Sequence, residues 1–515
     1  MPAADIILKN ASVITMEPGQ PVAELVAIKG DKIRLVAGSG ELEQVRGAKT
    51  RVIDCRGRTV VPGFNDAHCH IFSFIRKLLS LDLSPSSVSS IKDMKALIRR
   101  QVQNIPPGEW ITGTDYNEFY LAEKRHPDRR DLDEVAPHHP VVLAHRSLHA
   151  CVLNTRALSL AGITRATPEP PGGLIDRYPD TGEPSGLLFE MLGHIREKVL
   201  PPLPEGEIRK GTKLVNQHYL SLGITSLQDA TVVNDYSRWQ TLHGLKEAGE
   251  IKSRVSMMIG AGALPEFQQH GLTFGSGDSQ LRLGAVKIML NEATGELQPS
   301  PRELNRMVLD THRAGFQVAI HAVERMSVEA AIGALEYIAS QYPRAGRRHR
   351  IEHCSQCPPR LFERLRRLGA VVVTQPPFIY YSGERYLATL PVSDLKWLYR
   401  IGSFHRSGLT VAGSSDCPVV PADPLVGIYA AVTRRDESGQ RLLPREAISA
   451  GAALEMYTKN AAYASFEEKI KGSLAPGKLA DIIVLSDDPT KTPPERIKDI
   501  KVEMTIIGGE VVWEA

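Results

Sequence analysis

At 515 residues the chain is too long for one ordinary compact core, and it suits a large barrel with a smaller domain. Its 62 basic and 59 acidic residues leave a formal net charge of +3 without a long run of one sign, which argues against nucleic-acid and anionic-lipid partners. No export signal begins the sequence, and no segment has the roughly 18 consecutive apolar residues of a membrane-spanning helix. We therefore expect a cytoplasmic protein without disulfides.

Both ends of the chain have a β pattern. The first 60 residues contain short strand patterns separated by turn signals, and near the other end residues 502–507 and 510–513 flank a Gly508-Gly509 hairpin turn. Because chain termini often lie close together, we predict a small β-sandwich domain composed of residues 1–61 and 470–515.

The middle of the chain alternates strand and helix patterns, which indicates a parallel sheet. Eight strands are predicted: the segment 60–70 contains the first, and the others are residues 223–228, 254–259, 284–289, 317–321, 349–353, 370–374 and 409–413. Eight is the number that a closed barrel needs, so the predicted fold is an α/β (β/α)8 TIM-like barrel over residues 62–469. A long insertion at about 75–215 separates the first two strands.

The insertion has its own secondary structure. A helical pattern covers residues 91–105 and begins after Ser90, a predicted N-cap. Residues 110–114 and 141–145 are predicted strands.

A histidine pair ends the first barrel strand, which reads Val60-Val61-Pro62-Gly63-Phe64-Asn65-Asp66-Ala67-His68-Cys69-His70. Alternate side chains of a strand point to the same face, so His68 and His70 can face one point. Neutral imidazole is a common ligand of zinc and related metals. Taken alone, the pair is equally compatible with a structural or surface role.

Further polar residues stand where other predicted strands end: Lys287, His321, His353 and, just beyond the eighth strand, Asp416. Barrel enzymes place their chemistry at the carboxyl ends of the strands. Metal-type ligands at four separate strand ends are improbable by accident, and together they predict a metal site.

At these segments the chain resembles the amidohydrolase superfamily, in the branch that includes N-substituted formamide deformylases and YtcJ-like hydrolases. The matching segments are residues 61–70, 286–288, 320–322, 350–353 and 413–418, with support from 374–377, 458–462 and 472–481. The resemblance runs over nearly the whole length.

The resemblance implies a role for each of these residues. His68 and His70 correspond to the ligands of a more buried metal, and His321 and His353 to those of a second metal. Lys287 corresponds to a lysine that is carboxylated in many members and bridges two metals, which implies two zinc ions as cofactors. An ordinary lysine beside a single metal is the alternative.

Asp416 corresponds to an aspartate that contacts the metal and accepts a proton from the bridging water; its alternative role is a helix N-cap. The resemblance thus implies a hydrolase that cleaves an amide-like C–N bond by metal-bound hydroxide. The open alternatives are a cyclic imide, carbamate, ester or phosphotriester as substrate, and a metal-binding regulatory protein without turnover. We expect a small-molecule substrate and no nucleic-acid or membrane partner, and we leave a homodimer open.

Three residues are candidate substrate contacts. His149 corresponds to a histidine that the branch usually has, with a structural histidine as the alternative. Tyr380 and Tyr381 are predicted to lie in a loop that could cover the site, although aromatic residues in such loops commonly just pack.

Overall fold

The computed structural model describes residues 3–292, 295–344 and 346–515. The chain forms two compact units. The first contains Met1–His70, Asn216–Leu290 and Pro301–Ala515, and the second contains Ile71–Val215 and Asn291–Ser300. This division does not separate the terminal strands from the barrel, so domain boundaries at residues 61 and 470 stay predictions.

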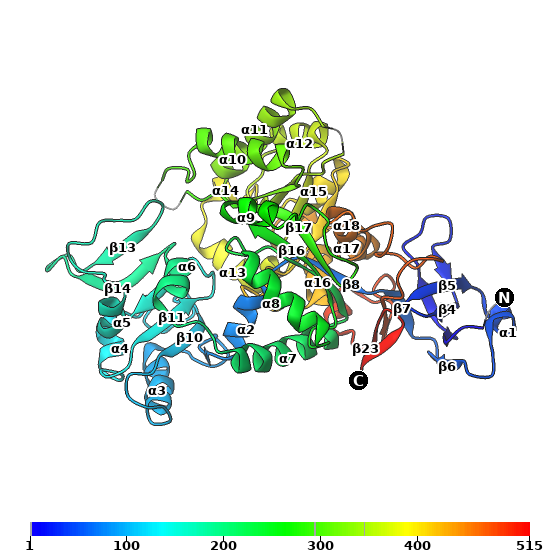
Figure 1. Ribbon diagram of the computed structural model, residues 1–515, viewed down its shortest axis with the longest axis horizontal. Coiled ribbons are helices and arrows are strands. Elements are labelled where there is room, and N and C mark those ends of the chain that lie inside the picture. The colour runs from blue at the N-terminus through cyan, green and yellow to red at the C-terminus, as the bar shows by residue number, and fades with distance from the viewer. Residues whose placement is uncertain (1–2, 293–294, 345) are drawn as a thin grey trace. The chain divides into compact units, whose positions relative to one another are not determined.

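The first unit contains the predicted barrel, a parallel eight-stranded sheet (Figure 1). Its strands are buried along almost their whole length because helices cover the outer face, as is usual for parallel sheets. They follow one another in chain order around the sheet, and all eight predicted strands are confirmed: β8 Phe64–Cys69, β15 Ile224–Asp229, β16 Arg254–Gly260, β17 Leu281–Met289, β18 Val318–Ala322, β19 Arg350–His353, β20 Val371–Thr374 and β21 Val411–Gly413.

The barrel closes just beyond the end of β21. Cys417 forms a parallel bridge with Cys69 of β8. The amide of His70 donates to the carbonyl of Cys417, and the amide of Asp416 donates to the carbonyl of His68, both at 2.8 Å. The segment after the last strand therefore runs beside the end of the first.

Helices connect the barrel strands and follow the last of them. Two of them end at a glycine with positive φ, as predicted: α10 is followed by Gly315 and α12 by Gly369, whose φ values of 88° and 58° suit a residue without Cβ. The helices are α7 Glu205–Ser221, α8 Tyr236–Glu247, α9 Leu264–Gln269, α10 Pro301–Arg313, α11 Arg325–Gln341, α12 Phe362–Leu368, α13 Pro377–Thr389, α14 Val392–Leu395, α15 Ile401–Arg406, α16 Pro424–Thr433, α17 Ala450–Met456 and α18 Lys459–Ala464.

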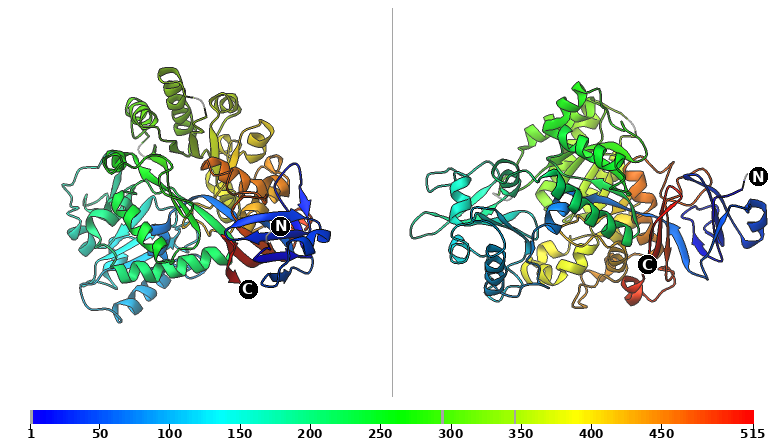
Figure 2. Two further views of the ribbon diagram at one scale, coloured as in Figure 1. Left: turned by 45° about the vertical axis from the view of Figure 1, so that its right-hand side comes forward. Right: turned by 60° about the horizontal axis from the view of Figure 1, so that its bottom comes forward.

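Strands from both ends of the chain share one sheet, as predicted (Figure 2). Ile482 of β22 pairs antiparallel with Pro62 of β7. This sheet and a second one bury a common apolar core, which makes a β-sandwich. The first sheet contains β24 Glu510–Glu514, β23 Val502–Ile507, β22 Ile482–Leu485, β7 Thr59–Pro62, β2 Ser12–Ile14 and β3 Val22–Ala23, and the second contains β5 Lys32–Ala37, β4 Leu25–Lys29, β1 Ile6–Lys9 and β6 Arg51–Asp54.

The second unit contains a mixed six-stranded sheet covered by short helices. The predicted helix is α3 Ile91–Val102, and Ser90 caps it by accepting from the amide of Asp93. The strands are β13 Leu174–Arg177, β14 Pro184–Phe189, β12 Ala150–Leu153, β11 Val141–His145, β10 Ile111–Tyr116 and β9 Leu81–Asp82, and the other helices include α2 Ile71–Leu78, α4 Arg129–Asp133 and α5 Thr155–Leu160. None of the helices in the described ranges has the length and hydropathy that crossing a membrane requires.

Candidate metal centre

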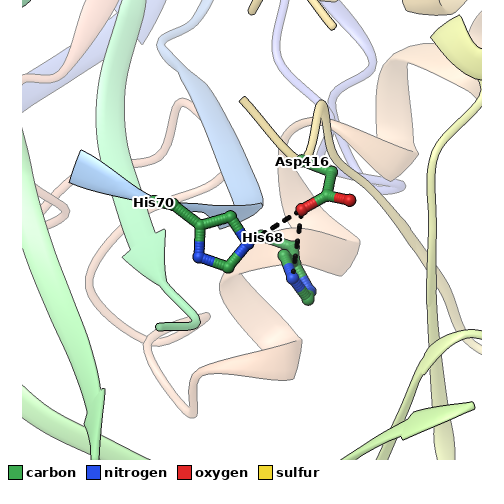
Figure 3. A group of neighbouring side chains, drawn as sticks. All are labelled: His68, His70 and Asp416. Carbon is green, nitrogen blue, oxygen red and sulfur yellow. Dashed lines mark hydrogen bonds and ion pairs between the residues drawn. The ribbon is translucent and has the colours of Figure 1, made fainter. Parts of the chain in front are cut away.

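Three of the predicted ligands converge at the seam between β8 and β21 (Figure 3). Oδ1 of Asp416 lies 2.9 Å from Nε2 of His70 and 3.5 Å from Nε2 of His68. Within the described residues, His68, His70 and Asp416 are the set of histidine and carboxylate side chains whose ligand atoms all lie within 4.8 Å of one another. The closure of the barrel, which pairs Cys69 with Cys417, creates this cluster.

The backbone at this rim is strained. His353 and Asp416 have φ values of 68° and 60°, in the left-handed region that non-glycine residues rarely adopt. Such a conformation costs about 1–3 kcal/mol per residue and persists only where the surrounding structure holds it. The N-cap alternative for Asp416 is wrong, because Asp423 is the residue that caps the next helix, α16.

The other predicted ligands adjoin this cluster. Nζ of Lys287, on β17, lies 3.4 Å from Nε2 of His68. The ring of His353 has its centroid 4.9 Å from that of His68 and 4.4 Å from that of His321. The side chains of His68, Lys287, His321 and His353 are all buried. Through these contacts the six predicted residues form one group at the carboxyl end of the barrel. Their roles as metal ligands stay predictions.

Two of the histidines are oriented through Nδ1 by neutral side chains. Nδ1 of His70 lies 2.9 Å from the hydroxyl of Thr231. Nδ1 of His353 donates to Oε1 of Gln375 at 2.8 Å, and the amide nitrogen of Gln375 donates in turn to Ser414. These contacts leave Nε2 of each ring for other partners.

Sequence reasoning missed Glu352, which lies 2.5 Å through Oε2 from Nδ1 of His68. Arg350 donates to both oxygens of this carboxylate, through Nε at 2.7 Å and Nη2 at 3.0 Å. Both residues are almost completely buried. The signal was present in the sequence: two charged residues, two apart in a strand that is otherwise buried, must face the same partners in the interior.

The electrostatics of the group fit a cation. Burial lowers the pKa of the His68 and His353 imidazoles, that of His353 to about 4, so both rings are neutral and have a lone pair to donate. Burial also lowers the pKa of Lys287 to about 8, although Glu352 and Asp416 oppose it. Burial raises the pKa of Asp416, but the hydrogen bond from His70 and the nearby imidazoles outweigh it and keep the carboxylate ionised. The residues present therefore suit a divalent metal in a nitrogen- and oxygen-rich site.

The three candidate substrate contacts do not all belong to one unit. His149 belongs to the second unit, where its Nδ1 lies 2.8 Å from Oε1 of Glu190. The prediction of a loop at Tyr380 and Tyr381 is wrong, because both residues lie in α13, where Pro377 at the N-terminus starts the helix instead of ending it. Tyr380 packs its ring against Tyr381 and Tyr429. A role in substrate binding stays a prediction for all three.

A (β/α)8 barrel with this group at its strand ends defines a metal-dependent hydrolase. The chain belongs to the amidohydrolase family, whose model matches residues 51–513. It is 28% identical to the N-substituted formamide deformylase of Arthrobacter pascens, over 99% of this chain and 98% of the relative, and 27% identical to the protein YtcJ of Bacillus subtilis (strain 168), over 93% and 94%. A solved structure of an uncharacterized metal-dependent hydrolase from Pyrococcus furiosus is similar, with a TM-score of 0.73 and 25% identity, over 94% of this chain and 100% of that one.

Proposed function

We propose that the protein hydrolyses the C–N bond of an N-substituted amide or formamide, using two zinc ions. The observation that carries this proposal is the convergence of Asp416, His70 and His68, with Lys287 and His353 beside them. The full-length similarity to an N-substituted formamide deformylase supports this substrate class.

The residues divide into two sets of donors. His68 and His70 would hold one ion, and His321 and His353 the other. Lys287 would bridge them as a carbamate, formed when its neutral amine adds to carbon dioxide and releases a proton. An ammonium would be repelled by the cations, and burial already favours the neutral amine. Bound zinc supplies a water of lowered pKa and polarises the carbonyl group to be attacked.

Asp416 is the general acid–base of the proposal. Its carboxylate is ionised and buried, so it can accept the proton of the attacking water and pass it to the leaving nitrogen. Oδ1 of Asp416 lies 2.9 Å from Nε2 of His70, so the carboxylate lies beside the donors that would hold one of the ions.

The same donors would serve a cyclic imide, a carbamate, an ester or a phosphotriester, because the fold does not decide among substrates. The alternative that is not an enzyme is a regulatory protein that binds metal without turnover. Purified protein with a measured zinc content should therefore be tested on matched formamides, amides, esters and phosphotriesters. Formamide or amide hydrolysis that disappears on chelation and returns with zinc is expected. Preference for another bond, or zinc-loaded protein inactive on every substrate, would contradict the proposal.

A further inference from the structure

Three histidines of the metal centre differ in the partner that Nδ1 contacts. His70 faces the hydroxyl of Thr231, and His353 faces the amide of Gln375, both neutral groups. His68 faces the carboxylate of Glu352 at 2.5 Å. An ionised carboxylate only accepts hydrogen bonds, so the proton of His68 lies on Nδ1 and the lone pair lies on Nε2.

The Glu352 carboxylate is itself held on the far side by Arg350. The guanidinium makes a bidentate contact with Glu352, donates from Nη2 to the carbonyl of Ala67 at 2.7 Å, and donates from Nη1 to Oε1 of Gln228 at 2.5 Å. Ala67 precedes His68 in β8, whereas Arg350 and Glu352 belong to β19. The ion pair therefore joins two strands that are not neighbours in the sheet, across the interior of the barrel.

Two consequences follow for His68. Its ring is fixed at Nδ1 by Glu352, and the backbone just before it is fixed by Arg350, so the direction of Nε2 is set from both ends. A carboxylate that accepts the Nδ1 proton of an imidazole also makes Nε2 of that ring more basic, and so a stronger metal ligand, than a hydroxyl or an amide in the same position would.

We infer that Glu352 is a positioning residue: it holds His68 in the Nδ1–H form, with Arg350 as its anchor, and strengthens zinc binding at the His68–His70 position. This inference rests on the proposed function only in needing a metal at the centre. It concerns the strength of metal binding and is independent of the substrate.

The test compares three single-residue variants with the wild type. Glu352→Gln keeps an acceptor for His68 but loses the charge, whereas Glu352→Asp keeps the charge but is too short to contact both Arg350 and His68. Asp481→Asn is the matched control, because Asp481 also forms a buried bidentate pair, with Arg254, but contacts no histidine in the described part of the chain. Zinc affinity is measured by competition with a chromophoric chelator, the metal environment by the visible spectrum of the cobalt(II) form, and stability by thermal unfolding without metal.

Both Glu352 variants should weaken the binding of one zinc ion by about 10–100-fold and change the cobalt spectrum. The control should lower the unfolding temperature and leave zinc affinity and spectrum unchanged. A merely structural carboxylate would behave differently: Glu352→Asp, which still neutralises Arg350, would then match the wild type.

The inference is overturned if the Glu352 variants bind every zinc ion within twofold of the wild-type affinity, or if Asp481→Asn weakens zinc binding equally. If Glu352→Gln does not fold, Glu352→Asp decides by the same criterion. Wild-type protein that binds zinc but cleaves no C–N bond would contradict the proposed function, while the predicted loss of zinc affinity would still support the inference. Wild-type protein that binds no zinc would overturn both.

Discussion

Oδ1 of Asp416 lies 2.9 Å from Nε2 of His70, although 346 residues separate them in the chain. The contact exists because Asp416 donates its amide to the carbonyl of His68 as the barrel closes, which sets the carboxylate beside the histidine pair. A backbone hydrogen bond of the barrel seam thus positions the proposed acid–base.

Replacing Asp416 with Asn should preserve zinc binding but lower kcat by roughly 10²–10⁴-fold, because an amide cannot relay the proton. The assay is turnover at saturating zinc, with the metal content measured on the same sample. Asp423→Asn is the control: this residue caps α16, and Asn caps a helix equally well, so activity should not change. A rate near that of the wild type in Asp416→Asn would rule out the role.

Lys287→Arg should reduce the bound zinc from two ions to at most one, because guanidinium cannot form a carbamate and stays charged. Wild-type protein reloaded with zinc in ¹³C-bicarbonate should show a carbamate carbon by NMR, and the variant should not. Lys246→Arg is the control, since Lys246 donates to backbone carbonyls of Ile251 and Ser253. Two ions bound without a carbamate signal would contradict the bridging role.

Acid should destabilise the protein through a pair of histidines outside the metal centre. The amide of Val318 donates to Nδ1 of His349, so the proton of His349 lies on Nε2 and is directed at Nδ1 of His312, 3.0 Å away. His312 in turn donates from Nε2 to the carbonyl of Tyr342. Every nitrogen of the two rings is used, so a further proton on either ring breaks a hydrogen bond.

The sign follows from the pKa of His349, which burial lowers from 6.5 to about 3. Below pH 6.5 the unfolded chain takes up a proton that the folded chain does not, so stability falls as the pH is lowered from 6.5 toward 3, by about 2 kcal/mol at pH 5. In His349→Asn the loss of stability between pH 7 and pH 5 should shrink, as measured by denaturant unfolding. His405→Asn, at an exposed histidine, should retain the wild-type slope. Equal slopes in wild type and His349→Asn would refute the assignment.

The joint between the barrel and the β-sandwich should depend on one buried ion pair. Arg254 of β16 contacts both oxygens of Asp481 at 2.7 and 2.9 Å. Arg254→Gln leaves the carboxylate buried without its counter-ion, which should cost about 3–5 kcal/mol and lower the unfolding midpoint in urea. Glu363→Gln, which removes exposed pairs with Arg366 and Arg367, should shift it little. Comparable shifts in the two variants would show that the buried pair does not stabilise the contact between the barrel and the β-sandwich.

The sequence by itself determined the barrel, its eight strands and the residues at their carboxyl ends. These features are local: a strand shows a period of two, a helix shows its caps, and the predicted ligands His68 and His321 stand near the ends of strand patterns. The loop predicted at Tyr380 and Tyr381 is instead a helix, because Pro377 occupies the first position of α13, where a proline needs no N–H partner.

Only the tertiary structure decided which groups act on those residues. Glu352 lies 284 residues from His68, and no local pattern encodes a contact between strands on different sides of a barrel. Closure of the sheet also sets the strained backbone of His353 and Asp416. The same holds for the hydrogen bonds that run from Arg350 through Glu352 to His68. A sequence can place a ligand at a strand end, but the direction of its lone pair is set by long-range packing and hydrogen bonds.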